Sequence, residues 1–423
     1  MANTIIMRRI IVLTLLLSVL LSSCKDPYLV LEPGPIEGNV SEVGNRKIPN
    51  SPNTLQHPDK FVWGASVVKG EDGNYHMLYS RWDTGPENTS FSNAWVLYSE
   101  IAYAVSKYPD RDFVHKAVIL RGRVHEGDST AWDAQAVHNP HIKRFNNKYY
   151  LYYIGNKDPG PVPEGRPGWK LGKRDRCQQN QLIGVIEFNS FTDLLKGNYV
   201  RPDKPLLIPR TRVKHDTENA YNPSPDSTEP LPDNLITVNP SVVYRKSDKK
   251  FLLYFKGNIY DPVWRGVHGV ALSESPTGPF RALDNFIFDI RNEDGTIASA
   301  EDPFVWYHKG HNTFYAIIKD FTGLISGSDP GLAILSSGDG INWAKPAGGT
   351  TFLMKELIFK SGNIFKVSHL ERPQLLTDNS GKPLVLYAAC SFEPVGNKKD
   401  GSTFNVHIPL RQKTKRRSDE ETK

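Results

Sequence analysis

The 423-residue chain contains three cysteines and, after residue 21, no long apolar run. The low cysteine content excludes a disulfide-dense scaffold, and the lack of long apolar runs excludes a polytopic membrane protein. Helix-length amphipathic periodicity is also absent after residue 25, which argues against an α-helical fold. The net charge of +6 is concentrated at the two ends of the chain. Because the body is nearly neutral and phosphate binding needs a clustered cationic face, nucleic acid is not expected as a partner.

The chain begins with an export signal. Two arginines precede the apolar run Ile10–Leu21, which is too short to span a bilayer comfortably. The run ends in Leu-Ser-Ser-Cys24, which resembles the lipobox of bacterial lipoproteins. We therefore expect residues 1–24 to be a lipoprotein signal peptide with Cys24 as the lipidation site. The protein is then exported to the outer membrane or cell surface of a Gram-negative bacterium, and its lipid is its only contact with the membrane. An ordinary secretory signal with an incidental cysteine is the alternative.

The segments that flank the body look unstructured. Residues 25–58 are rich in Pro, Gly, Asn and Ser, and they are predicted to form a linker or N-terminal extension. Residues 411–423 hold six basic and three acidic residues and are predicted to be a disordered tail. The repeats described next place Cys177 and Cys390 in non-adjacent units, so both are expected to be free.

One pattern recurs five times between residues 59 and 410. An apolar strand, often opened by a proline, is followed by a tight polar turn and an aromatic strand. The copies are Trp63–Ser80, His138–Gly155, Val238–Gly257, Glu301–Asp320 and Glu371–Cys390. Further strand signals follow most copies. About four strands per repeat, five times over, predict an all-β fold, a five-bladed β-propeller. A β-sandwich with chance similarity between its strands is the alternative.

Propeller geometry separates the connections into two faces. The short polar turns fall on one face and the long loops on the other, and long loops gathered on one face are typical of a binding site. The inner strands should open onto that long-loop face. Two rings of residues are then predicted at the channel mouth: Gly64, Asn139, Asn239, Asp302 and Arg372 directly before the aligned positions, and Trp63, His138, Val238, Glu301 and Glu371 one residue earlier.

Several carboxylates are expected at this mouth. Asp133 lies six residues before Asn139 and is predicted to reach the mouth from the entry to its blade. Acids around one cavity suit glycoside hydrolysis, which needs one protonated carboxyl to donate and one ionised carboxylate to activate water or attack carbon. Residues two apart on a strand share a face, so His369 is a second candidate donor beside Glu371. The alternative is that Asp-Pro and Asn-Pro pairs merely open strands.

The predicted site divides into two sets. The candidate catalytic residues are Asp133, Asp302, Glu371 and His369. The candidate substrate contacts are Trp63, His138, Asn139, Asn239, His268, Glu301 and Arg372. No cofactor is required by this chemistry. His138 and His268 are the candidates for a structural divalent cation in the channel, although no ligand spacing defines a metal site.

Several stretches resemble a known family. FVWGASVVKGEDGNYHMLYSRW (61–82), WDAQAVHNPHI (132–142), AEDPFVWY (300–307) and HLERPQLL (369–376) are similar to glycoside hydrolase family 117, and more broadly to the five-bladed glycosidases of families 43, 32 and 68. The resemblance implies an inverting exo-hydrolase that removes a terminal sugar from algal-type oligosaccharides, such as 3,6-anhydro-L-galactose.

Position by position, the resemblance implies roles for three acids. Asp133 matches the general base, Asp302 the acid that tunes pKa and orients substrate, and Glu371 a general-acid candidate. The family's N-terminal dimerisation element is present only in part, as residues 41–46 with Val43 in place of alanine, and it carries the expectation of a homodimer. Two other functions stay open: a non-catalytic, glycan-binding surface lipoprotein, and arabinofuranosidase or xylosidase specificity on the same fold.

Overall fold

The computed structural model describes residues 28–415, apart from 45, 85–89, 215–216, 221–227, 261–262, 328, 347–348 and 350. The signal peptide and Cys24 lie outside the described residues, so the lipoprotein assignment stays a prediction. Within the described part of the chain, no helix is long and apolar enough to cross a membrane.

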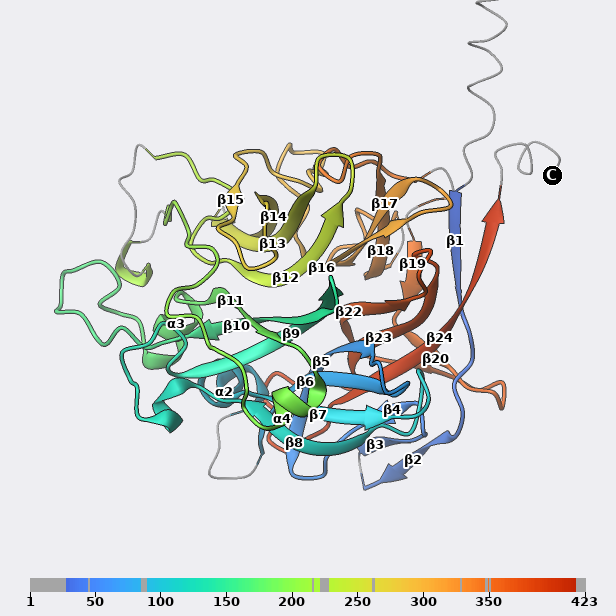
Figure 1. Cartoon of the computed structure of the whole chain (residues 1–423). Helices are drawn as coiled ribbons and strands as arrows, with labels where there is room; N and C mark the ends of the chain where they lie inside the picture. The colour runs from blue at the N-terminus through green and yellow to red at the C-terminus, as the bar shows by residue number, and fades with distance from the viewer. Residues whose placement is uncertain are drawn as a thin grey trace, which may run out of the picture.

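Five antiparallel sheets form the blades of a propeller, which confirms the predicted fold (Figure 1). Blades 1 to 4 follow the chain in order, and blade 2 has three strands rather than four. Their strands are β5 (Lys60–Lys69), β6 (Tyr75–Asp83), β7 (Glu100–Ser106) and β8 (Val114–Leu120); β9 (Ala136–Phe145), β10 (Lys148–Asn156) and β11 (Leu182–Phe188); β12 (Val238–Arg245), β13 (Lys250–Tyr260), β14 (Trp264–Ser273) and β15 (Arg281–Ala282); and β16 (Ala300–His308), β17 (Thr313–Asp320), β18 (Gly331–Ser337) and β19 (Thr351–Met354).

Blade 5 is completed by the beginning of the chain. Its own strands are β22 (His369–Thr377), β23 (Pro383–Ser391) and β24 (Phe404–Lys415). The outer edge of β24 pairs with β4 (Thr54–Leu55) near its start and with β1 (Tyr28–Pro33) along residues 410–415. In Figure 1, β1 and β24 run side by side although they lie at opposite ends of the sequence.

This pairing corrects two predictions. Residues 28–33 are not part of a free linker, because Leu29 and Leu31 are buried in the core between blades 4 and 5. The predicted tail begins too early as well, because residues 411–415 continue β24. Both errors have one cause: the strand signals at the two ends are weak until each end supplies the other's hydrogen-bonding edge.

Short elements fill the connections. Two hairpins, β2 (Asn39–Val43) with β3 (Arg46–Asn50) and β20 (Glu356–Ile358) with β21 (Ile364–Lys366), lie outside the blades. The sequence showed no helical periodicity, yet three short helices are present: α2 (Phe91–Tyr98), α3 (Lys173–Gln178) and α4 (Phe191–Leu195). Two 3₁₀ turns cover Arg123–Glu126 and Thr217–Asn219. Helices α2 and α3 belong to two of the long loops.

The core is a ring of inter-blade clusters. Alternate residues of a strand face opposite sides of its sheet, so each blade contributes to two clusters. On β13, Leu252 and Tyr254 pack toward blade 4, whereas Leu253 and Phe255 pack toward blade 2. Cys177 and Cys390 are both free and buried, as predicted.

Each inner strand carries the same backbone irregularity near its start. A register shift interrupts its pairing with the second strand, and one residue there has a positive φ. These residues are Gly64 (52°), Asn139 (52°), Asn239 (58°), Asp302 (58°) and Arg372 (55°), the ring predicted from sequence. Glycine, asparagine and aspartate tolerate this conformation, whereas arginine is uncommon there. Bulges of this kind re-aim side chains, here toward the long-loop mouth.

A polar layer separates this mouth from the other end of the channel. His141 is fully buried; its Nε2 accepts a hydrogen bond from the N–H of Val242, and its Nδ1 lies 2.9 Å from Oε1 of Gln374. Burial lowers the pKa of His141 to about 3, so the ring is neutral and donates from Nδ1. The long-loop face and the short-turn face therefore open into two different cavities.

Candidate active site

A cavity of about 230 Å³ occupies the long-loop mouth of the channel. Both predicted rings contribute to it, and Gly64 is the one member of either ring that does not line it. The lining residues the sequence predicted are Trp63, His138, Asn139, Val238, Asn239, Glu301, Asp302, Glu371 and Arg372. Further walls come from β6, helices α2 and α3, the long loops and β13, and they add Trp82, Phe91, Trp95, Gln178, Gln181, Ile236, Lys256 and Asn258.

The floor of the cavity is a chain of hydrogen bonds across blades 2 to 5. Asn139 donates to Asn239 over 3.2 Å, and Asn239 donates to Oδ1 of Asp302 over 2.8 Å. Arg372 closes the chain by donating to Asp302 from its backbone N–H and its Nη1. Blade 1 has room for no side chain here, because a Cβ at Gly64 would lie 3.4 Å from Oδ1 of Asn139.

Asp302 therefore has a structural place in this floor. Burial raises the pKa of Asp302, while the Arg372 guanidinium acts against that rise. The carboxylate accepts three hydrogen bonds from two other blades, which leaves little of it for a ligand. It fixes the left-handed conformation of Arg372 and so holds the start of β22 in position.

Two glutamates stand above the floor and share a lysine. Lys319 Nζ lies 2.6 Å from Glu371 Oε1 and 3.7 Å from Glu301 Oε2, so these two oxygens are at most about 6.3 Å apart. Lys256 forms a close ion pair with the other oxygen of Glu301. Burial raises the pKa of Glu301, but the ammonium groups of Lys256 and Lys319 outweigh burial and leave the pKa lowered. Glu301 is therefore a carboxylate in the free protein.

Glu371 is held ionised more firmly. Burial raises its pKa, but Lys319 and the His369 N–H outweigh this and lower the pKa to about 2. Nδ1 of His369 lies 2.9 Å from Oε1 of Glu371, as the shared strand face predicted. His369 is 29% exposed and packs edge-on against Trp63, which lines the cavity. With Nδ1 engaged by Glu371, Nε2 is the ring nitrogen that remains for a ligand.

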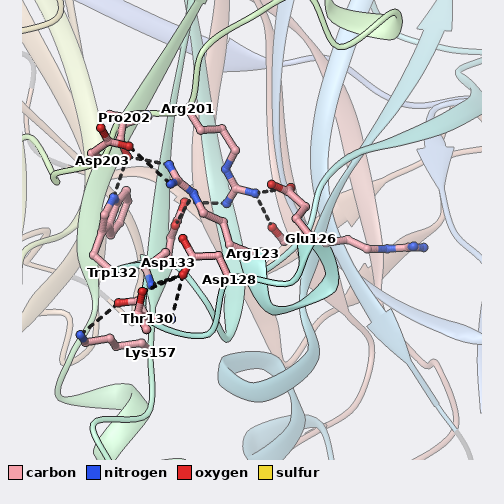
Figure 2. A network of polar contacts seen from close by, with 12 residues as sticks. Arg123, Glu126, Asp128, Thr130, Trp132, Asp133, Lys157, Arg201, Pro202 and Asp203 are labelled. Carbon is pink, nitrogen blue, oxygen red and sulfur yellow. Dashed lines mark hydrogen bonds and ion pairs between the residues drawn. The ribbon is translucent and has the colours of Figure 1, made fainter.

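Asp133 is not part of this arrangement. It is fully buried and does not line the cavity. Arg123 Nε lies 3.0 Å from one of its oxygens, and Arg201 Nη2 lies 2.5 Å from the other. Tyr153 also donates to this carboxylate. Figure 2 shows the two guanidinium groups converging on Asp133, with Glu126 beyond Arg201. The prediction that Asp133 joins Asp302 and Glu371 in one pocket is therefore corrected: its cations neutralise it outside the channel mouth.

The two predicted histidine contacts differ in position. His138 lines the cavity, and its Nε2 lies 2.9 Å from Oε1 of Gln181. Burial lowers the pKa of His138 to about 3. Because the Gln181 oxygen can only accept, the neutral ring carries its proton on Nε2 and leaves Nδ1 as an acceptor without a partner in the described chain. His268 does not line the cavity and packs edge-on against Phe288.

The histidines do not define a metal site. Among the described residues, no group of three or more His, Cys, Asp or Glu side chains is placed to hold a metal ion. His138 and His268 serve different surroundings, so the sequence-based suggestion of a channel cation finds no ligand set in this part of the molecule.

The sequence reasoning missed the two lysines. Lys256 and Lys319 occupy similar places near the ends of the second strands β13 and β17, inside otherwise apolar stretches (FLLYFKG and FYAIIKD). A lysine in such a strand carries a desolvation cost that needs a carboxylate opposite, and the register places Lys319 directly opposite Glu301. That pattern was the available signal.

The fold and the site thus define a five-bladed propeller with an acidic and aromatic pocket at one mouth. Solved structures share this fold. A family 117 glycoside hydrolase produced by the marine bacterium Zobellia galactanivorans is 14% identical, with a TM-score of 0.53 and 91% of each chain covered. BT0996, in a complex with RGII, is 11% identical (TM-score 0.54; 89% of this protein and 92% of that one). A further glycoside hydrolase is 12% identical (TM-score 0.54; 92% and 94%). No protein family description and no curated protein matches the sequence.

Proposed function

We propose that the protein is a glycoside hydrolase that removes a terminal sugar from an oligosaccharide. The observation that carries the proposal is the pair Glu301 and Glu371, brought together by one lysine in a pocket with aromatic walls. Two carboxyl groups around one glycosidic bond are the usual machinery of this reaction. The fold shared with glycoside hydrolases supports the same class, although fold alone does not fix activity.

The shape of the site supports action at a chain end. The cavity at the mouth is smaller than the roughly 300–1,000 Å³ of most drug-sized ligand pockets and suits one sugar residue. A second compartment of about 510 Å³ adjoins it and shares Gln178, Ile236, Lys256, Asn258 and Glu301 with it. Trp264, 41% exposed, stands in this second compartment as a stacking surface. The terminal sugar occupies the first compartment and the rest of the chain the second.

In this proposal the scissile bond lies at the junction of the two compartments. Glu301 lines both, so its carboxylate reaches the anomeric centre and activates water there. Glu371 is ionised and orients His369, whose Nε2 donates the proton to the leaving oxygen. This arrangement keeps the single-displacement, inverting chemistry expected from the sequence but replaces Asp133 by Glu301 as the base.

A panel of algal and plant oligosaccharides tests this proposal. We expect release of monosaccharide from the non-reducing or reducing end of at least one of them, with inversion of the anomeric configuration in a proton NMR time course. Internal cleavage to larger fragments would contradict exo action, and retention would contradict the water-activating role of Glu301. The panel includes substrates with terminal 3,6-anhydro-L-galactose, arabinofuranose and xylose, because the sequence left these specificities open.

A second function is favoured by one observation. Both glutamates already have ammonium partners, Lys256 and Lys319, so the pocket is electrically balanced without a ligand. A site of this kind suits a surface protein that binds a glycan without cleaving it. Calorimetric titration with the same panel separates the two functions: saturable binding with no released sugar, over days at high protein concentration, supports the binding protein.

A further inference from the structure

The short-turn face of the propeller contains a second cavity of about 450 Å³. It lies at the other end of the channel, where the inner strands of blades 1, 2, 4 and 5 end, and residues from β5, β9, β16 and β22 line it. The buried layer of His141 and Gln374 separates it from the candidate active site. It is therefore a separate compartment and not an extension of the pocket described above.

This far cavity is rich in positive charge. Lys143 lines it, with Nζ 4.7 Å from the ring centroid of buried Phe304, and no described carboxylate pairs with it. Lys69 lines it too, with its ammonium over the Tyr75 ring. Burial lowers the pKa of Lys143 to about 8, the direction expected for an ammonium without a counter-charge.

The remaining charged groups at this mouth are already engaged. Arg144 forms a close ion pair with Glu71. Asp378 is the one described carboxylate that lines the cavity, and its Oδ1 accepts the backbone N–H groups of Ser380 and Lys382 within its own turn. The charges that face the cavity therefore leave Lys69 and Lys143 uncompensated among the described residues.

We propose that this far cavity is an oxyanion site, in which the Lys143 ammonium binds a phosphate, sulfate or carboxylate group, either free or carried by a sugar. A desolvated ammonium is unfavourable until it is paired, and an oxyanion supplies both the charge and the hydrogen-bond acceptors. The aromatic ring of Phe304 beneath the ammonium keeps it at the cavity wall. This site is independent of the proposed hydrolase activity.

Calorimetric titration of the full chain with inorganic phosphate, glucuronate and glucose tests the site. We expect phosphate or glucuronate to bind with one-to-one stoichiometry and glucose not to bind. Binding of phosphate assigns a free ion, whereas binding of glucuronate alone assigns an oxyanion on a sugar. Lys143→Met should weaken binding at least tenfold and Lys143→Arg should retain it. Lys148→Met, on the same hairpin but half exposed and paired with Glu187, is the matched control and should bind normally.

Titration of the lysine itself gives a second readout. In protein with isotopically labelled lysines, the Lys143 resonance should shift its midpoint upward by about one pH unit when the anion is present, because pairing favours the charged form. Lys143→Met should fold with an unfolding temperature no lower than that of the parent, since it removes an unpaired, desolvated charge. Equal binding by Lys143→Met and the parent, or an unchanged Lys143 midpoint at saturating phosphate and glucuronate, would overturn the proposal.

Discussion

Glu301→Gln is expected to lower kcat on a true oligosaccharide substrate by about 10³-fold while the protein stays folded. The amide cannot take a proton from water, and general acid–base catalysis typically contributes about 10²–10⁴-fold. The amide keeps the shape of the side chain, and the fold does not depend on the Glu301 charge in the way that it depends on buried Asp302. Steady-state kinetics with matched circular dichroism spectra measure the effect. Glu274→Gln, an exposed partner of Lys250, is the control and should be unchanged.

The proton donor is identified by changing the leaving group. His369→Gln should lose a similar factor on the natural substrate but much less on a glycosyl fluoride, because fluoride departs without protonation. Glu301→Gln should be impaired on both. Glu371→Gln should resemble His369→Gln, since it removes the acceptor that orients the imidazole. If Glu301→Gln is the variant that recovers on the fluoride, Glu301 is the acid and the roles assigned above are reversed.

Asp133→Asn is expected to destabilise the protein by about 3–5 kcal/mol and to leave the kcat of the folded fraction almost unchanged. Removing one partner of a buried ion pair leaves the other charge uncompensated, and here Arg123 and Arg201 would both lose their carboxylate. Denaturant unfolding with kinetics on the same preparation measures both quantities. Asp284→Asn removes an exposed partner of Arg210 and should cost less than about 1 kcal/mol.

The two quantities discriminate between two interpretations of Asp133. A base, as the family resemblance implies, would lose turnover with little loss of stability. A structural carboxylate loses stability with little loss of turnover. A large fall in kcat for folded Asp133→Asn would contradict its placement outside the reaction and would require Asp133 to reach the mouth in the substrate complex.

The ring at the channel mouth was predictable because its information is local and repeated. Aligning four prolines and one alanine located Asn139, Asn239, Asp302 and Arg372, and all four have the same left-handed backbone. The surroundings of Asp133 were not predictable in this way. Its partner Arg201 lies 68 residues further along the chain, between repeats, and no periodic pattern announces it. Likewise, sequence spacing gave no measure of how strongly Lys319 depresses the pKa of Glu371.

The closure of blade 5 by β1 shortens the path from the lipid to the body. If Cys24 is acylated, only three residues separate it from Tyr28, a reach of roughly 10–15 Å at most. Tyr28 pairs with Lys415, beyond the short-turn end of β24. A protein tethered there would rest with its short-turn side toward the bilayer, and the Glu301–Glu371 pocket would open outward, where glycans arrive from the surroundings.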